Sequence, residues 1–480
     1  MTAANFDNQS LRSFLDMVES DFPEEILRIR EGVDTRFDMT AIAYELERAG
    51  RSPIIIFEQP GRTDAGVGAS GGSPNGMNGM KVVTNVAGNR KLLAACLGVA
   101  PQDLPTAFRE RCQRYIPCEV VTDAAWNDVV IEGDDIDLTR LPIPLQFAVD
   151  GGPYITAGQL AARDPVTGVD TTGFHRLMLK GRNRLGVSLH SRRRMFEFQR
   201  RAEERGEPLP VAVTIGTHPL HYMGSMVYAY PPNVRKLEII GGLFGAPYRV
   251  ARCGVADLEV PAGAEIVIEG EILAGVREPE GPFSEFTGYA SFRSTQNVFV
   301  AKRVRMRKDA IFHSVVSGMS QDHILVSCIT REGEILNTLR RNLPNVKAVH
   351  VPHNTCGAFM AFIAMKKTSA GEPQQAIMAA LGTEFYTKYV IVVDDDVDVF
   401  NLADVMWAVA TRVRAEQDIV FIPGAKGAIL DPTSDPEDFT LTKMGIDATK
   451  PLGRDFAARL TISDEQQARV RGILERVGVG

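Results

Sequence analysis

The last third of the chain alternates short apolar strands with helices of about ten residues, and this alternation limits the folds that it can adopt. The expected strands cover 348–352, 388–400 and 418–424, and the expected helices cover 372–381 and 404–413. Strands separated by helices of this length favour a parallel sheet with β–α–β crossovers. We therefore predict a C-terminal α/β domain over residues 316–480, with a final helix within 461–480.

Two further regions are expected before this domain, because 480 residues are too many for one hydrophobic core. Residues 121–315 contain β-branched, alternating segments divided by turn signals, which is typical of a barrel or a sandwich. Residues 1–120 combine a short apolar strand at 53–58 with helical patterns, and the stretch from Ser10 to Arg48 looks largely helical. The predicted class is an α/β multidomain protein with a β-rich centre.

The composition argues against several classes of protein. A net charge of −7 gives no basic footprint for nucleic acid. No run reaches the roughly 18 apolar residues of a membrane span, and the first residues show no signal-peptide pattern. The six cysteines form no CxxC pair and are expected to be reduced thiols. We expect a cytoplasmic protein with neither nucleic-acid nor membrane partners.

Acidic residues gather in the segment REPEGPFSEFTGY, residues 277–289. Glu280 and Glu285 stand on either side of GPFS, which is otherwise small or apolar. Two prolines and a glycine restrict the backbone, so both carboxylates are held in place. The segment could be a surface turn with solvated acids, or it could present both carboxylates to one pocket, and these residues alone leave the choice open.

Other polar residues are candidates for metal or anion binding. Arg176 lies among small residues in a strand–turn–strand pattern, where a guanidinium could bind a carboxylate through two hydrogen bonds. Glu238 precedes a Gly-rich turn in an apolar segment and needs a partner, which a metal shared with His190 would supply. The histidine pairs of 218–221 and 350–353 lack the glutamate of a zinc HExxH motif.

Several motifs together carry a resemblance to a known family. In order along the chain, TTGFHR, SLH, LEIIGGLFG, EGPFSEFTGY, KYVIVVDDDVDV, DVMWAVATR and GIDATK resemble those of the UbiD family of reversible decarboxylases. The resemblance covers nearly the whole chain, and the EGPFSEFTGY motif is quite specific. It implies a central split-barrel flavin-binding domain, prenylated FMN as cofactor, a divalent metal (usually Mn²⁺) that bridges the cofactor phosphate to the protein, and a K⁺ ion nearby.

The resemblance also implies roles for individual residues. Arg176, Glu280 and Glu285 match the catalytic network, and we expect Glu285 to donate the proton while Glu280 positions Arg176. His190 and Glu238 match metal ligands, whereas Thr171 stands where the family has an asparagine ligand. The expected cofactor-binding residues are Thr171, Gly173, Phe174, His175, Arg176, Leu189, His190, Glu238 and Lys388.

The implied reaction is the reversible, non-oxidative loss of CO₂ from an aromatic, heteroaromatic or α,β-unsaturated carboxylic acid. Phe286 could stack on a flat substrate, and His323 could hydrogen-bond a second polar group. A flavin prenyltransferase would supply the cofactor, and a homodimer or homohexamer is expected. Two alternatives stay open: a flavin-binding member without decarboxylase activity, and a subunit of a carboxylase complex.

Overall fold

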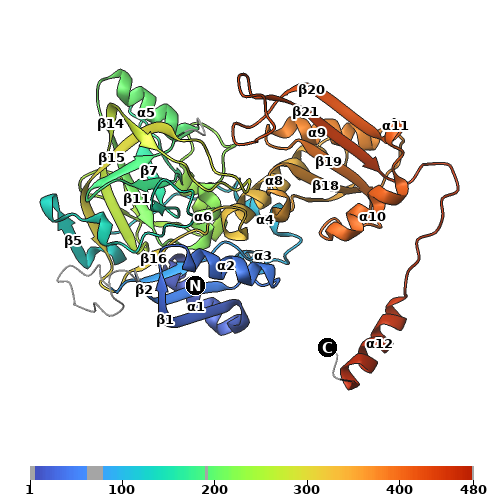
Figure 1. The fold of residues 1–480 in the computed structure, drawn as a ribbon, viewed down its shortest axis with the longest axis horizontal. Helices are drawn as coiled ribbons and strands as arrows, with labels where there is room; N and C mark the ends of the chain where they lie inside the picture. Colours follow the sequence, from blue (N-terminus) through green and yellow to red (C-terminus); the bar gives the residue numbers. More distant parts are fainter. Residues whose placement is uncertain (1–5, 62–78, 190–192, 478–480) are drawn as a thin grey trace.

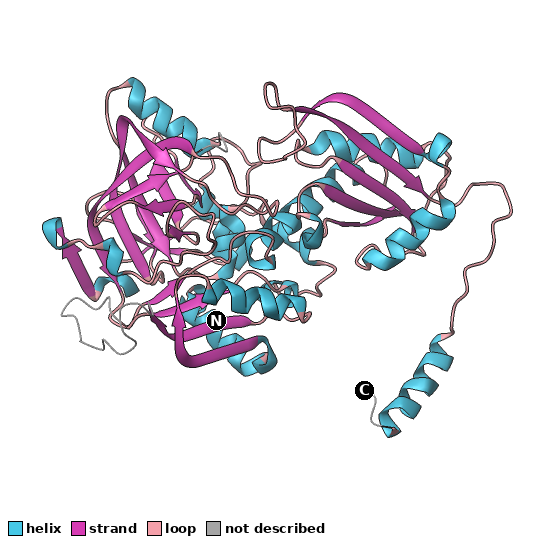
Figure 2. Ribbon diagram, in the orientation of Figure 1, coloured by secondary structure: helices cyan, strands magenta, loops and turns pink. Residues whose placement is uncertain are grey.

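The computed structural model describes residues 6–61, 79–189 and 193–477, which form four β-sheets with helices packed against them (Figures 1 and 2). None of the helices in these ranges combines the length and the apolar character that a membrane crossing requires. The six cysteines, all within the described ranges, are free thiols as expected.

The N-terminal part is a four-stranded sheet with helices packed on it. Its strands, in spatial order, are β1 (Ile26–Asp34), β2 (Ile54–Gly61), β3 (Lys81–Thr84) and β16 (Ile311–His313). The helices are α1 (Leu11–Asp21), α2 (Asp38–Arg48), α3 (Arg90–Cys96) and α4 (Leu104–Arg111). Strand β1 corrects the prediction that Ser10 to Arg48 is largely helical. It is an edge strand whose side chains are mostly exposed or half-buried, so its period is weak and the helical patterns on both sides obscure it.

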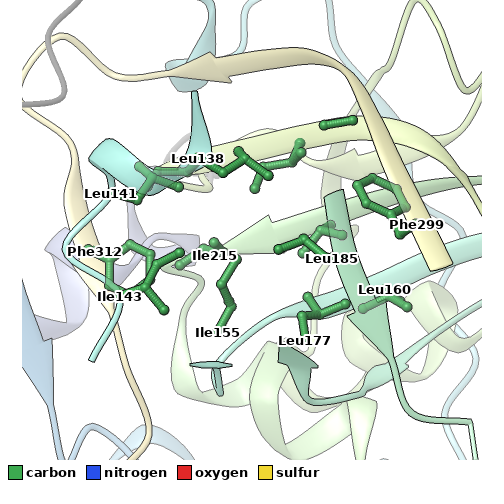
Figure 3. Packing of buried hydrophobic residues seen from close by; sticks show 14 of the residues in the cluster. Leu138, Leu141, Ile143, Ile155, Leu160, Leu177, Leu185, Ile215, Phe299 and Phe312 are labelled. Carbon is green, nitrogen blue, oxygen red and sulfur yellow. The ribbon is translucent and has the colours of Figure 1, made fainter. Parts of the chain in front are cut away.

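The central part is a nine-stranded sheet that curls into a half-barrel (Figure 2), as predicted. Two long antiparallel strands, β14 (Ile266–Glu280) and β15 (Ser294–Met306), lie at its middle. The other strands are β5 (Val129–Glu132), β6 (Tyr154–Ile155), β7 (Gln159–Arg163), β8 (Asp170–Phe174), β9 (Leu177–Leu179), β10 (Arg184–Val187) and β11 (Leu209–Ile215). Their inward side chains, which include the fully buried Leu160, Leu185 and Phe299, form much of the core in Figure 3.

Smaller elements complete the central part. A three-stranded sheet contains β4 (Glu119–Val120), β12 (Arg249–Arg252) and β13 (Glu259–Pro261), and the helices are α5 (Arg194–Glu204), α6 (Pro219–Ser225) and α7 (Lys236–Phe244). Helix α7 corrects the predicted Gly-rich turn after Glu238. Its Gly242 lets the chain at Arg114 approach closely, because a Cβ there would lie 1.9 Å from the Arg114 carbonyl oxygen. Two glycines that looked like a turn in sequence are therefore packing positions inside a helix.

The C-terminal part is a mixed sheet, which corrects the prediction of a wholly parallel one. Its strands, in spatial order, are β17 (Val346–His350), β18 (Met360–Met365), β19 (Tyr389–Asp394), β21 (Thr440–Ala448) and β20 (Ile419–Lys426). The inner three strands are parallel, and the two edge strands are antiparallel to their neighbours. The helices are α8 (Gln321–Arg340), α9 (Glu372–Thr383), α10 (Leu402–Arg412) and α11 (Ala415–Asp418). The expected final helix is α12 (Asp464–Arg476), which lies apart from the rest of the chain at the end of an extended segment (Figure 1).

Candidate active site

A cavity of about 720 Å³ lies beside the half-barrel and is walled by elements far apart in the sequence. Strand β8 and the residues after it form one wall, the starts of α5 and α7 and the end of α6 form another, and the first turns of α8 form a third. Of the residues expected to bind cofactor or substrate, those on this surface are Thr171, Gly173, Phe174, His175, Arg176, Glu285, Phe286 and His323.

Arg176 joins the two glutamates of the EGPFSE segment into one network. Its Nε and Nη2 donate to the two carboxylate oxygens of Glu280, each at 2.9 Å, and its Nη1 donates to Oε1 of Glu285. Glu280 is fully buried, Glu285 is 6% exposed, and the guanidinium lies 5.0 Å from the centre of the Phe283 ring. The interpretation of this segment as a solvated surface turn is therefore wrong.

The turn between the two glutamates is fixed by the chain that packs against it. Gly281 has a φ of 87°, which a residue with a side chain rarely adopts. Gly151 approaches it so closely that a Cβ on Gly151 would lie 2.3 Å from the Gly281 carbonyl oxygen. Asp150 accepts a hydrogen bond from the backbone N–H of Ser284 at 2.7 Å. Strand β14 thus ends at Glu280, and the chain turns so that Glu285 reaches the same guanidinium.

The surroundings of Glu285 raise the pKa of its carboxyl group. Burial raises the pKa of Glu285, the Arg176 guanidinium opposes this, and the neighbouring Glu280 carboxylate raises the pKa further. Burial lowers the pKa of Arg176, but its hydrogen bonds to Glu280 and the charges of both glutamates outweigh burial and raise it, so the guanidinium stays charged. Glu285 is therefore a carboxyl group of raised pKa held beside a charged guanidinium.

The aromatic side of the cavity contains Phe286 and His323. The Phe286 ring packs edge-on to His323, with centroids 6.3 Å apart, and also contacts Tyr386 at 6.1 Å. His323 Nδ1 donates to the Gly318 carbonyl oxygen at 2.9 Å, which leaves Nε2 as an acceptor. Burial lowers the pKa of His323 to about 4, so its ring is neutral at pH 7 and can accept a hydrogen bond from a substrate.

The expected metal ligands do not come together in the described residues. Thr171 lines the cavity, but its hydroxyl is hydrogen-bonded to the Tyr230 hydroxyl at 3.0 Å. Glu238 is not on the cavity wall, and its charge acts on the thiol of Cys118. His190 lies outside the described residues. Within the described ranges no group of three or more His, Cys, Asp or Glu side chains could hold a metal ion. The described donor set therefore does not fit a divalent metal.

Two other residues expected to contact the cofactor lie away from the cavity wall. Leu189 is 1% exposed and packs in the core of the half-barrel. Lys388 precedes β19 in the C-terminal part, where its ammonium group pairs with Asp431 at 2.7 Å and donates to Thr433 at 2.9 Å. Their assignment as cofactor contacts stays a prediction.

Several cavity residues were missed from the sequence. Lys236, Arg193, Arg194, Ser225, Arg331 and Tyr386 all line the cavity. Lys236 is 8% exposed, and burial lowers its pKa to about 7. Lys236 and Glu238 are two residues apart on α7, so their side chains point about 200° apart around the helix axis. Only one of them can therefore face the cavity. The helical period of this segment could have identified Lys236, but interpreting the segment as a Gly-rich turn conceals that period.

Comparisons with known proteins agree with the motifs. Family models described as the N-terminal, Rift-related and C-terminal domains of 3-octaprenyl-4-hydroxybenzoate carboxy-lyase match residues 21–112, 119–320 and 324–448. Anhydromevalonate phosphate decarboxylase of Methanothermobacter thermautotrophicus is 33% identical over 442 residues, which are 92% of this chain and 97% of that protein.

Solved structures with similar folds include two of one enzyme. The UbiD-class enzyme HmfF of Pelotomaculum thermopropionicum, in complex with FMN, has a TM-score of 0.88 and 34% identity, over 96% of this chain and 99% of its own. An evolved dimeric form of HmfF in complex with prFMN has a TM-score of 0.82 and 34% identity, over 94% of this chain and 97% of its own.

Proposed function

This chain belongs to the UbiD family of carboxy-lyases, and from that membership we propose that it releases CO₂ from an aromatic, heteroaromatic or α,β-unsaturated carboxylic acid with prenylated FMN as cofactor. The observation that carries the proposal is the network in which Arg176 and Glu285, both on the wall of one cavity, are joined to the buried Glu280 behind them. The FMN and prFMN complexes of HmfF support the choice of cofactor.

The cavity suits a flat, anionic cofactor together with a substrate acid. Its volume of about 720 Å³ lies within the usual range of roughly 300–1,000 Å³ for ligand sites. Aromatic rings such as Phe174, Tyr222 and Phe286 provide flat surfaces, and Arg193, Lys236 and other basic groups provide positive charge. When bound, prenylated FMN supplies the electron sink that no side chain offers for a carbon–CO₂ bond.

Arg176 is placed to hold the substrate carboxylate. A guanidinium has five N–H groups, and the contacts to Glu280 and Glu285 use Nε and one hydrogen on each Nη. One N–H on each terminal nitrogen is left, and together they can bind a carboxylate. Glu280, with both oxygens on Arg176, fixes the plane of the guanidinium. Arg176 is therefore proposed as the group that orients the acid.

Glu285 is proposed as the proton donor. When CO₂ leaves, the electron pair of the broken bond remains on the substrate carbon, and a proton must replace CO₂ there. A neutral Glu285 can deliver that proton and become a carboxylate beside Arg176, and solvent protonates it again for the next turnover. Burial raises the pKa of Glu285, which is the direction that a general acid requires. In the reverse direction the same carboxylate removes the proton before carboxylation.

The exposed C-terminal helix supports a proposal of homo-oligomers. Helix α12 and the segment before it expose apolar side chains, including Leu460 (97% exposed), Ile462 and Ile473. A helix that lies apart from the other described residues of its chain is marginally stable in water, so we propose that a second copy covers it. The dimeric form of HmfF is consistent with this assembly.

The first experiment is mass spectrometry of the small molecules released from protein that is co-produced with a flavin prenyltransferase. The expected result is prenylated FMN near one per chain, followed by CO₂ release from at least one member of a panel of acrylic, hydroxybenzoic and heteroaromatic acids. Release of plain FMN or no flavin from freshly purified protein, with no turnover on the panel, would contradict the proposal and favour the alternatives of an inactive flavin-binding member or a complex subunit.

A further inference from the structure

We propose that this chain binds the phosphate group of its flavin through its own side chains, Lys236, Arg193, Arg194 and Ser225, without a divalent metal. These four residues are called the cationic cradle below. The inference rests on the proposed function, because it assigns the phosphate end of the proposed cofactor.

Lys236 is a buried cation at an unfavourable position. It is the first residue of α7, after the N-cap Arg235, so its charge lies at the positive end of the helix dipole. Its side chain is 8% exposed and lines the cavity. Of its three N–H groups, one donates to the Ser225 carbonyl oxygen at 3.0 Å. An anion in the cavity would offset both the burial of the charge and the dipole.

Ser225 offers a second donor at the same place. Its carbonyl oxygen holds Lys236, and its hydroxyl is buried without a hydrogen-bond partner among the described residues. The residue is 4% exposed and lines the cavity. Buried polar groups are nearly always paired, so an unpaired hydroxyl on a cavity wall indicates a missing ligand. A phosphate oxygen that binds Lys236 would lie within reach of this hydroxyl.

Arg193 and Arg194 bring two more positive charges to this end of the cavity. Both line it, and their charges act on Lys236. Arg194 donates to the carbonyl oxygen of Pro231 at 2.7 Å and lies 3.7 Å from the centre of the Tyr230 ring. Arg193 lies 4.9 Å from the centre of the Tyr228 ring. In the described part of the chain, no carboxylate forms an ion pair with Lys236 or with either of these arginines.

The other charged side chains on the cavity wall that form ion pairs are Arg176, Glu285, Arg331 and Glu197. Arg176 binds two glutamates, and Arg331 pairs with Glu384 at 3.2 Å. Glu197, which also lines the cavity, pairs with Arg200 at 2.6 Å. The positive charge that no carboxylate of the described residues neutralises therefore lies at the cationic cradle. A phosphate monoester carries up to two negative charges and several acceptor oxygens, which matches a group of three cations and one free hydroxyl.

The same residues disfavour a divalent ion. Lys236, Arg193 and Arg194 would repel a metal cation, and none of the three can act as a ligand while charged. Thr171 is engaged with Tyr230, and Glu238 is absent from the cavity wall. The role that the family resemblance gives to a metal is therefore assigned here to Lys236 and its neighbours.

The test compares FMN with riboflavin, which lacks the phosphate. The apo protein is titrated with each flavin, and binding is followed by flavin fluorescence, in EDTA and in Mn²⁺. We expect FMN affinity to be the same in both conditions. Lys236→Met should weaken FMN binding by about 10- to 100-fold, Ser225→Ala by about 3- to 10-fold, and neither should change riboflavin binding. Lys236→Arg should restore most of the affinity.

Lys443→Met is the matched control, because Lys443 is also a buried lysine bound to carbonyl oxygens, those of Leu381 and Glu384, but lies in the C-terminal part away from the cavity. It should leave the ratio of FMN to riboflavin affinity unchanged. The cradle proposal is overturned if EDTA abolishes FMN binding and Mn²⁺ restores it, or if Lys236→Met binds FMN as tightly as the wild type. In that case decarboxylation by the metal-loaded protein would still uphold the proposed function. Failure of the wild type to bind either FMN or prenylated FMN would overturn both proposals.

Discussion

Substitution of Glu285 by glutamine tests the proposed proton donor with little change in shape. Glu285 is 6% exposed, and its contact with Arg176 uses one carboxylate oxygen. The amide oxygen of glutamine can accept that hydrogen bond, so the fold and the orientation of Arg176 should persist. The amide cannot release a proton at neutral pH, so only the acid function is lost.

The magnitude follows from the role of a general acid. Loss of such a group lowers the rate by about 100- to 10,000-fold, which corresponds to about 2.7–5.4 kcal/mol in the activation barrier. The assay is kcat for CO₂ release from an accepted acid, with the flavin content of each preparation measured first. A second readout is the exchange of hydrogen for deuterium at the reacting carbon when the decarboxylated product is incubated with enzyme in D₂O. The rate of this exchange should fall in Glu285→Gln together with kcat.

Glu278→Gln is the matched control, and Glu278 lies near the end of β14, the strand that precedes Glu285. Glu278 pairs with Arg184 and with Lys180 outside the cavity, and its side chain is 30% exposed. We expect its kcat to stay within about twofold of the wild type, as is usual for surface substitutions. If Glu285→Gln binds prenylated FMN and retains kcat within threefold, another group protonates the product, and the assignment of Glu285 is refuted.

Three further predictions concern the network, the pH dependence and the packing. Glu280→Gln weakens the two-point hold on Arg176, so KM for the acid should rise and kcat should fall by at least about tenfold, measured by steady-state kinetics against Glu278→Gln. Burial raises the pKa of Glu47 from 4.5 to about 7, so the folded state binds this proton more tightly than the unfolded state does. The free energy of unfolding should therefore fall as the pH rises from about 5 to 8. Urea titrations should show a smaller fall for Glu47→Gln. Gly242→Ala places a Cβ against the Arg114 carbonyl, and calorimetry should show a loss of at least about 2 kcal/mol, whereas Gly472→Ala in exposed α12 should cost nothing.

The proposed catalytic motif could be found from the sequence because its constraint is local. EGPFSE combines two acids with residues that restrict the backbone, and the helices and strands on each side have clear periods. Strand β1 and the antiparallel edges of the C-terminal sheet were not predicted. Edge strands bury little, and the direction of a strand depends on which neighbour it pairs with rather than on its own residues.

The sequence by itself determined the family, the α/β class with a β-rich centre, and the pairing of Arg176 with two glutamates. The tertiary structure decided which polar groups share a cavity. Residues of β8, α5, α6, α7 and α8 meet there only because these elements pack around one space; they include residues 171–174, 194, 225, 236, 323, 324, 327 and 331. The choice between Lys236 and Glu238 shows why: they are two residues apart, yet helix geometry turns one toward the cavity and the other away. Which face of α7 meets the cavity depends on the neighbours against which the helix packs, among them the Arg114 backbone beside Gly242.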